Sequence, residues 1–305
     1  MRIFYIKHAD IDKEKWDKCI ADSANELIYA YSYYLDIMSK NWDALVLNDY
    51  EAIMPLTWNK KFGISYLRQP FFTQQLGIFG NIFFDEKVTG SFINKALEIF
   101  PFAEINLNYA NQYKNGETNR CNLILPLNRS FDEIKKTFRK DFVNKIRSNN
   151  LIYQPSDDIE KAIQIFKENY HNKIRISSKA YHDWLQLSIV LETKNQILVR
   201  KVSSVDGELL SIALLLKDKR RIYYVMSSTL PSGRKQQSNY FLLYHVIKEF
   251  AGQDLVFDFE GSEIPSIKLF ISKFGGVEQS YPFVKINNLS FWKRWMKNVY
   301  DYLKK

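Results

Sequence analysis

The chain has 305 residues, of which 46% are hydrophobic and 15% aromatic, so it can bury a large core and is too apolar to be disordered. Its 43 lysines and arginines outnumber 34 acidic residues and give a net charge of +9, which indicates either an anionic partner or a solvated basic surface. Cys19 and Cys121 are too few and too widely spaced for a metal knuckle or a disulfide framework. The N-terminus has no apolar signal-peptide core, and no window reaches the roughly 18 apolar residues of a membrane span. We therefore expect no integral membrane insertion and a cytoplasmic protein, with the inner face of the membrane as a further option.

The first half of the chain alternates between strand and helix patterns. The turn residues Asn48 and Asp49 predict a hairpin over 44–58, and Asp10 is the expected N-cap of the first helix. Strands are predicted over 2–8, 65–72, 104–110 and 121–127, and helices over 10–24, 29–42 and 88–101.

The second half opens with Ser130 and Glu133, which have the spacing of a capping box and predict a basic helix over 130–150. The pair Asp206-Gly207 is a strong hairpin signal, because glycine accepts positive φ without steric cost. A polar loop over 230–239 is expected to end with Ser238 or Asn239 as a helix cap. Helices are predicted over 157–172, 177–195, 240–252, 264–276 and 290–305, and strands over 196–206, 208–221, 222–229, 255–260 and 280–286.

The order of these elements from 196 to 286 matches the core of the GNAT acyltransferase fold, in which the fourth strand splays from the fifth. The segment 258–276 also resembles a signature of the Fem-like branch of that superfamily, where a strand ending in Asp-Phe-Gly-Gly-Ser precedes a short helix. The matching residues are Asp258, Phe259, Gly261, Ser262, Phe270, Phe274 and Gly275. The first half repeats the element order of the second. The resemblance therefore implies two tandem GNAT-like lobes, 1–128 and 129–305, each an α/β fold with a mixed, mostly antiparallel sheet flanked by helices.

In the GNAT core, backbone amides of the loop before the crossing helix hold the pyrophosphate of the acyl carrier, helped by the positive end of that helix. The resemblance places an anionic donor, acyl-coenzyme A or aminoacyl-tRNA, at the polar loop. Its residues are Ser232, Gly233, Arg234, Lys235, Gln236, Gln237, Ser238 and Asn239. Gly233 is its only glycine, and Lys235 stands where the family has a second small residue. A plain surface loop is the alternative.

Acyl transfer to an amine needs a proton acceptor and groups that stabilise the oxyanion. Asp258 and Glu260 alternate at the end of a predicted strand and would share one face, so either is a candidate proton acceptor. Tyr224 and Tyr281 are candidates for shaping the acceptor cleft. The alternative is structural: the carboxylates would cap the next helix or pair with Lys268, and the tyrosines would belong to the core.

Four further residues are candidates for substrate contact. Aligned on the two phenylalanines of the Fem-type signature, the lysine position of that family is Ile271 here, and Lys268 and Lys273 are its nearest replacements. His171 and Arg175 lie in a connection between two helices and would line an acceptor cleft, with solvent exposure as the alternative. The four histidines form no HxxxH or HExxH pair, so we expect no metal site.

The resemblance implies a Fem-like acyltransferase that transfers an acyl or aminoacyl group to an amine of a cell-envelope or sugar-linked acceptor. The alternative from another class is a non-catalytic binding protein on a degenerate GNAT fold, which the departures at Lys235 and Ile271 favour. Binding of RNA, including tRNA, through the basic helices is a third option, with an affinity that falls steeply with salt. The basic helix expected over 290–305 would either dock on the core or contact a membrane surface.

Overall fold

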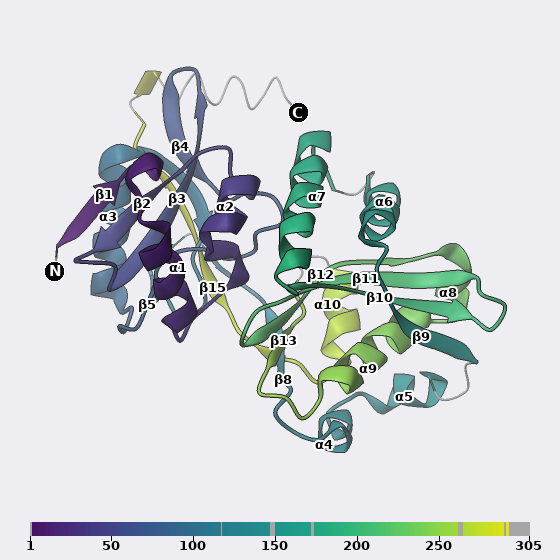
Figure 1. Ribbon diagram of the computed structural model, residues 1–305. Coiled ribbons are helices and arrows are strands. Elements are labelled where there is room, and N and C mark those ends of the chain that lie inside the picture. The colour runs from purple at the N-terminus through teal and green to yellow at the C-terminus, as the bar shows by residue number, and fades with distance from the viewer. Residues whose placement is uncertain are drawn as a thin grey trace. The chain divides into compact units, whose positions relative to one another are not determined.

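The chain folds into two compact units, which are described separately. The computed structural model describes residues 2–116, 118–146, 150–171, 174–261, 265–289 and 291–292. Unit 1 comprises 1–120 and 281–305, and unit 2 comprises 121–280 (Figure 1). All but two residues of the helix predicted over 290–305, with its docking or membrane contact, lie outside the described residues.

Unit 1 is built on one mixed sheet in the order β1-β2-β3-β4-β6-β15-β7, with β5 paired to β3. Its strands are β1 (Ile3–Ile6), β2 (Trp42–Leu47), β3 (Ala52–Lys61), β4 (Ile64–Arg68), β5 (Phe79–Gly80), β6 (Phe102–Asn106), β7 (Thr118–Arg120) and β15 (Tyr281–Asn287). Its helices are α1 (Lys13–Asp22), α2 (Ser32–Met38) and α3 (Glu86–Ile99), with single turns η1 (His8–Asp10) and η2 (Ile28–Ala30). Among the described strands of this unit, β4 and β6 form the only parallel pair.

Unit 2 holds the second mixed sheet, in the order β14-β8-β13-β12-β11-β10-β9. Its strands are β8 (Leu123–Pro126), β9 (Leu151–Ser156), β10 (Ile197–Ser204), β11 (Leu209–Lys217), β12 (Arg221–Thr229), β13 (Val256–Asp258) and β14 (Val277–Glu278). Its helices are α4 (Phe131–Lys136), α5 (Lys140–Ile146), α6 (Ile159–Tyr170), α7 (Ser178–Thr193), α8 (Pro231–Lys235), α9 (Ser238–Phe250) and α10 (Pro265–Ser272). Figure 1 shows α6 and α7 on one face of this sheet and α9 on the other. The predicted class, two mixed and mostly antiparallel sheets flanked by helices, is confirmed.

The last strand differs most from the sequence analysis. The segment 196–286 was expected to form one GNAT core, but β15 pairs with β6 and β7 in the sheet of unit 1. β8, which was predicted to lie in the first lobe, belongs to unit 2 and pairs there with β13 and β14. Unit 2 is therefore the continuous stretch 121–280, and unit 1 is completed by a strand that follows it in the chain. The cause is a pairing between strands that are far apart in the sequence, which local sequence patterns do not predict.

Local capping signals account for several helix starts. The Ser130–Glu133 capping box is present in both directions, as predicted. The cap of α1 is Asp12, whose side chain accepts from the Lys15 N–H, rather than Asp10, which lies in the turn η1. The predicted helix over 29–42 is shorter, because an extended residue, Tyr31, separates η2 from α2.

The basic helix predicted over 130–150 is interrupted between α4 and α5. The Thr137 hydroxyl donates to the Ile134 carbonyl at 2.6 Å, and the Arg139 N–H donates to the Lys273 carbonyl at 2.9 Å instead of continuing the helix. Gly275 packs so closely there that a Cβ would lie 2.0 Å from the Thr137 hydroxyl oxygen. A tertiary contact with the segment after α10 therefore overrides the local helical preference.

His245 on α9 gives unit 2 a pH dependence that can be measured. Its ring centroid lies 4.3 Å from that of Phe241 and 5.3 Å from that of Tyr153. Burial, followed by the nearby Lys248 charge, lowers the pKa of His245 below its ordinary value. The unfolded chain therefore takes up this proton more readily than the native protein, and the contribution to stability is lost as pH falls through the folded-state pKa. We expect urea unfolding to show a smaller loss of stability between about pH 7.5 and pH 5 for His245→Phe than for the unaltered protein. Equal losses in the two proteins would contradict this account.

Candidate functional site

Unit 2 contains a point where two parallel strands part. Strands β12 and β13 pair over only Arg221–Tyr223 and Val256–Asp258, after which β13 ends and β12 continues to Thr229. Helix α9 forms the crossover between them (Figure 1). This arrangement is the one that the GNAT resemblance implies: a short parallel pairing, a divergence, and a helix whose N-terminus follows the longer strand.

The segment before α9 is not the open loop that was predicted. Residues 231–235 form the short helix α8, and Gln237 then adopts a left-handed conformation, with φ of 54°, where α9 begins. Ser238 and Asn239 are the first residues of α9 rather than its side-chain caps. The run of polar residues from 232 to 239 shows no helical pattern in the sequence. The turn α8 forms where Gly233 packs on β11.

Gly233 is the residue that allows α8 to pack. It is buried, and a Cβ at this position would lie 2.1 Å from the Leu210 carbonyl oxygen and 2.5 Å from the Ser238 Oγ. Such distances are far below van der Waals contact, so a side chain at residue 233 would push α8 away from β11. The glycine therefore has a structural reason that is independent of any ligand.

The polar side chains around α8 have mixed roles. The Ser232 hydroxyl donates to Glu208 at 2.6 Å, and the Arg234 Nε donates to the Thr229 carbonyl at 3.1 Å. Arg234, Lys235 and Gln236 are exposed. Ser238 is fully buried, and its Oγ has no hydrogen-bond partner among the described residues. Two cations and a buried hydroxyl thus lie at the N-terminus of a 13-residue helix, whose dipole favours an anion.

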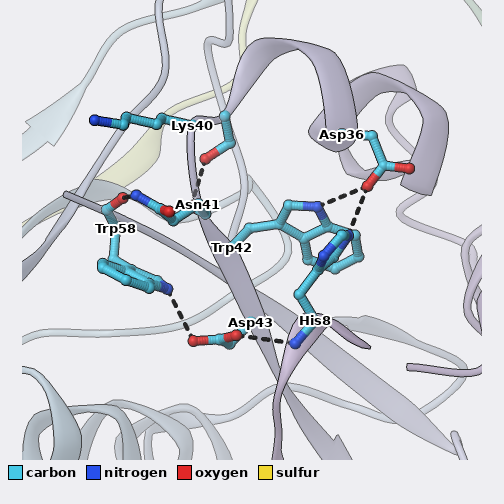
Figure 2. A pocket seen from close by; sticks show the side chains of 8 residues that line it. His8, Asp36, Lys40, Asn41, Trp42, Asp43 and Trp58 are labelled. Atoms are coloured by element: carbon cyan, nitrogen blue, oxygen red, sulfur yellow. Dashed lines mark hydrogen bonds and ion pairs between the residues drawn. The ribbon is translucent and has the colours of Figure 1, made fainter. Parts of the chain in front are cut away.

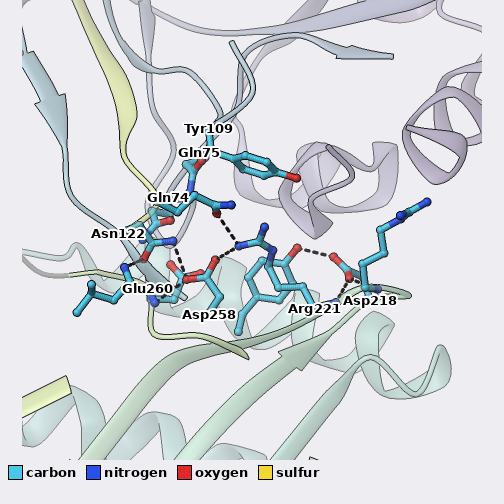
Figure 3. A network of polar contacts seen from close by, with 12 residues as sticks. Gln74, Gln75, Tyr109, Asn122, Asp218, Arg221, Asp258 and Glu260 are labelled. Carbon is cyan, nitrogen blue, oxygen red and sulfur yellow. Dashed lines mark hydrogen bonds and ion pairs between the residues drawn. The ribbon is translucent and has the colours of Figure 1, made fainter. Parts of the chain in front are cut away.

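Asp258 lies in a buried polar network rather than in an open cleft. It is 1% exposed and forms an ion pair with Arg221, with 2.5 Å between Nη1 and Oδ2 (Figure 3). Its other oxygen, Oδ1, accepts from the Asn122 side-chain amide at 2.9 Å and from the Glu260 N–H at 2.8 Å. The alternative in which Asp258 pairs with Lys268 is not realised, because Arg221 is the cation that pairs with Asp258. With its charge balanced and both oxygens engaged, Asp258 has the geometry of a structural carboxylate.

Glu260 does not share a strand face with Asp258. Strand β13 ends at Asp258, and Glu260 has a left-handed φ of 62°. The predicted alternation of side chains along strand 255–260 therefore stops at Asp258. Glu260 is partly exposed at the bend that follows.

A second buried carboxylate in the same network was missed by the sequence analysis. Asp218 accepts from the Tyr223 hydroxyl and from the N–H groups of Arg220 and Arg221 (Figure 3). Burial raises the pKa of Asp218, against the opposing effect of these hydrogen bonds and the Arg221 charge. A charged turn was the only sequence signal at this place, and it gave no indication that Arg221 would be buried between two carboxylates.

The two candidate tyrosines belong to different units. Tyr224 packs in the core of unit 2 beside Phe257, with 6.0 Å between ring centroids, and burial raises its pKa. Tyr281 is the buried first residue of β15 and pairs with Arg120 in the sheet of unit 1. For Tyr224 the contacts are those of a core residue, the alternative that the sequence left open.

The four candidate substrate residues lie in two places within unit 2. Lys273, just after α10, donates to the Tyr240 hydroxyl at 3.1 Å, and its Nζ is 3.5 Å from Asp141. The Tyr240 hydrogen bond, with Asp141 adding to it, raises the pKa of Lys273. Lys268 is exposed on α10. His171 and Arg175 are exposed in the connection between α6 and α7, where the His171 Nδ1 is 2.7 Å from the Glu168 carbonyl oxygen.

The described part of the chain has neither a metal-binding cluster nor a helix that could span a membrane. No group of three or more His, Cys, Asp or Glu side chains there is arranged to hold a metal ion. Among the described helices, none combines the length and apolarity needed to cross a bilayer.

Comparisons with known proteins agree with this geometry. Residues 143–263 match the family described as acetyltransferase (GNAT) domain. The crystal structure of FemX is similar over 100% of both chains, with a TM-score of 0.65 and 12% identity. The C-terminal domain of a putative lysylphosphatidylglycerol synthetase from Agrobacterium fabrum is similar over 91% of this chain and 92% of its own, with a TM-score of 0.54 and 11% identity. A conserved protein of unknown function from Bacteroides thetaiotaomicron is similar over 90% of this chain and 97% of its own, with a TM-score of 0.55 and 9% identity.

A search of curated proteins returned no significant match. The family match and the full-length structural similarity nevertheless lead to one conclusion. Residues 143–263 match the acetyltransferase (GNAT) domain family, and the whole chain has the tandem GNAT fold seen in FemX.

Proposed function

We propose that unit 2 binds an acyl donor through its anionic carrier and transfers the acyl group to an amine. The observation that carries the proposal is the N-terminus of α9, placed where β12 leaves β13. There the helix dipole, the exposed cations Arg234 and Lys235, and the unpartnered Ser238 hydroxyl would all favour phosphate. Acyl-coenzyme A and aminoacyl-tRNA both carry phosphates and are the two donor classes that fit.

An amine in cell-envelope synthesis, or one linked to a sugar, is the acceptor that we favour. The net charge of +9 suits a phosphate-bearing precursor, and a domain of a putative lysylphosphatidylglycerol synthetase shares the fold. Because Asp258 is committed to Arg221 and Asn122, removal of the amine proton would fall to Glu260 or to a chain of waters. Asp258 would act on Glu260 by holding its backbone N–H.

Thermal unfolding with candidate donors tests this proposal. A ligand that binds only the native state raises the melting temperature, and at about 100 times Kd it adds about 2.7 kcal/mol of stability. We expect a rise of several degrees with at least one of acetyl-, succinyl- and long-chain acyl-coenzyme A or an aminoacyl-tRNA. We expect that rise to be greatly reduced in the double variant Arg234→Glu/Lys235→Glu.

A matched control for charge is Lys161→Glu, which changes an exposed lysine on α6 of the same unit. It should leave the ligand-induced rise unchanged. The proposal fails if no donor raises the melting temperature, or if Lys161→Glu abolishes the rise as fully as the double variant does. Gly233→Trp is not a suitable probe, because a side chain there meets the Leu210 carbonyl whether or not a ligand binds.

A non-catalytic binding role is the second candidate, and one observation favours it. Two residues that were expected to serve the donor site and the reaction have structural contacts instead: Gly233 packs on β11, and Asp258 is paired with Arg221. This role predicts that a donor raises the melting temperature while mass spectrometry detects no acylated product with any offered amine. Product formation would exclude it.

A further inference from the structure

Unit 1 contains a pocket of about 170 Å³ that the acyltransferase proposal does not use (Figure 2). It lies where η1, the end of α2 and strands β2 and β3 meet. Its wall combines two indoles, an imidazole, two carboxylates and an amide, contributed by His8, Asp36, Asn41, Trp42, Asp43 and Trp58. At about 30 Å³ for each water of liquid, the space suits a group of about five or six heavy atoms.

The ring N–H groups of this pocket are already committed. The Trp42 indole donates to Asp36 at 3.0 Å, and the Trp58 indole donates to Asp43 at 2.8 Å. The His8 Nε2 lies 2.8 Å from Asp36. Asn41 directs its amide nitrogen to the Trp58 carbonyl at 3.4 Å, which leaves its amide oxygen as an acceptor. The wall therefore offers acceptors rather than donors, and a ligand has to bring its own N–H or O–H groups.

The charges favour a cationic donor over a neutral one. Asp36 is balanced by Lys13, with 2.7 Å between the Nζ and Oδ2. Asp43 is 7% exposed, and its hydrogen bonds come from three neutral groups: the Tyr5 hydroxyl at 2.8 Å, the His8 N–H at 2.9 Å and the Trp58 indole. In the part of the chain that the structure describes, no salt bridge joins Asp43 to a cation.

Three further features describe the surroundings of the Asp43 carboxyl group. Burial, together with the hydrogen bond and charge of Asp43, raises the pKa of Tyr5 to about 12. The Asp43 Oδ1 receives only the His8 N–H, so it has a lone pair left. Figure 2 shows the ammonium of Lys40 directed away from Asp43, on the rim of the pocket. Among the described residues, the buried Asp43 carboxyl group therefore has a free acceptor position and no cation in contact with it.

We propose that this pocket binds the primary ammonium group at the end of a short aliphatic chain. The ammonium would donate to Asp43 Oδ1, with Asp36 and the Asn41 amide oxygen as further acceptors. The half-buried Trp58, whose ring is fixed by its bond to Asp43, would supply a cation–π contact. The site is separate from the donor segment of unit 2, and ammonium binding there does not depend on acyl transfer.

The test is a titration of the full chain, labelled with ¹⁵N, with n-butylammonium chloride, followed through the indole N–H resonances. The chain has six tryptophans, and of those that the structure describes, Trp42 and Trp58 line this pocket. We expect saturable shifts of these two resonances, weakened by salt because a charge pair forms. n-Butanol, which has the same chain length but no charge, should give no saturable shift at the same concentrations.

Two variants make the assignment specific. Asp43→Asn keeps the shape and should weaken binding by about tenfold or more, because a charge-assisted hydrogen bond becomes a neutral one. Lys40→Ala removes a like charge from the rim and should tighten binding about twofold or more, a gain that a misfolded protein cannot produce. The proposal is overturned if butanol binds as well as butylammonium, if Lys40→Ala has no effect or weakens binding, or if methyl glucoside shifts the two indoles while butylammonium does not.

Discussion

Replacing Arg221 with methionine is expected to lower the free energy of unfolding by about 3–5 kcal/mol. The side chain is 5% exposed and its partner Asp258 is 1% exposed, so the substitution leaves a buried carboxylate without its cation. The lost contact also includes the Gln279 Oε1, which accepts from Arg221 Nη1 at 3.2 Å. Urea unfolding followed by circular dichroism measures the change as a shift of the midpoint at constant slope.

A matched control distinguishes the loss of a buried ion pair from the loss of an exposed one. Lys95→Met breaks the Lys95–Glu98 pair on α3, whose side chains are 37% and 62% exposed, and should cost no more than about 1 kcal/mol. The double variant Arg221→Met/Asp258→Leu should recover part of the loss, because it removes the stranded charge. Recovery will be incomplete, since Asn122 and the Glu260 N–H lose their acceptor. A loss for Arg221→Met as small as that for Lys95→Met would show that the buried pair does not hold β12 to β13.

Gly233→Ala is the second large expected effect, with a cost of about 1–3 kcal/mol or more. The added methyl group would lie 2.1 Å from the carbonyl oxygen of Leu210, which is part of strand β11 in the middle of the sheet. To remove this steric clash, α8 would have to move away from β11. The same unfolding measurement applies, and loss of donor binding would accompany the loss of stability if the N-terminus of α9 is the donor site.

Gly90→Ala is the control, because it makes the same chemical change in open space. Gly90 lies inside α3, its added Cβ would meet no atom within 4 Å, and its φ is not positive. Alanine there should stabilise the protein by roughly 0.5–1 kcal/mol through helix propensity. Equal stability changes at residues 90 and 233 would mean that α8 does not pack on β11 as described.

What the sequence predicted well depends on local chemistry. The capping box at Ser130 and the hairpin at Asp206-Gly207 need only residues a few positions apart, and both are present. The crossing of α9 between β12 and β13 also followed from helix and strand periodicity. The family resemblance added the fold class, which the full-length similarity to FemX bears out.

What the sequence did not predict depends on contacts between distant segments. The Arg221–Asp258 pair joins residues 37 apart, and no local pattern distinguishes this arginine from the charged residues beside it. Helix α8 forms within an apparently polar loop because Gly233 fits against Leu210, a contact that periodicity does not reveal. The hydrogen bond from the Trp58 indole to Asp43 in the unit 1 pocket likewise connects neighbouring strands. The residues around Trp58 in the sequence do not indicate which side chain will accept this bond.

The return of β15 to the sheet of unit 1 bears on the order in which the two units can fold during synthesis. Unit 2 is one continuous stretch, 121–280, and all of its strands have left the ribosome once that stretch has emerged. Unit 1 begins at the N-terminus, yet its sheet lacks β15 until residues 281–287 appear, because that strand pairs with both β6 and β7. Domains of a nascent chain usually mature from the N-terminus onward. Here the later unit can close first, and the sheet of the earlier unit stays open at one edge until residues 281–287 have emerged.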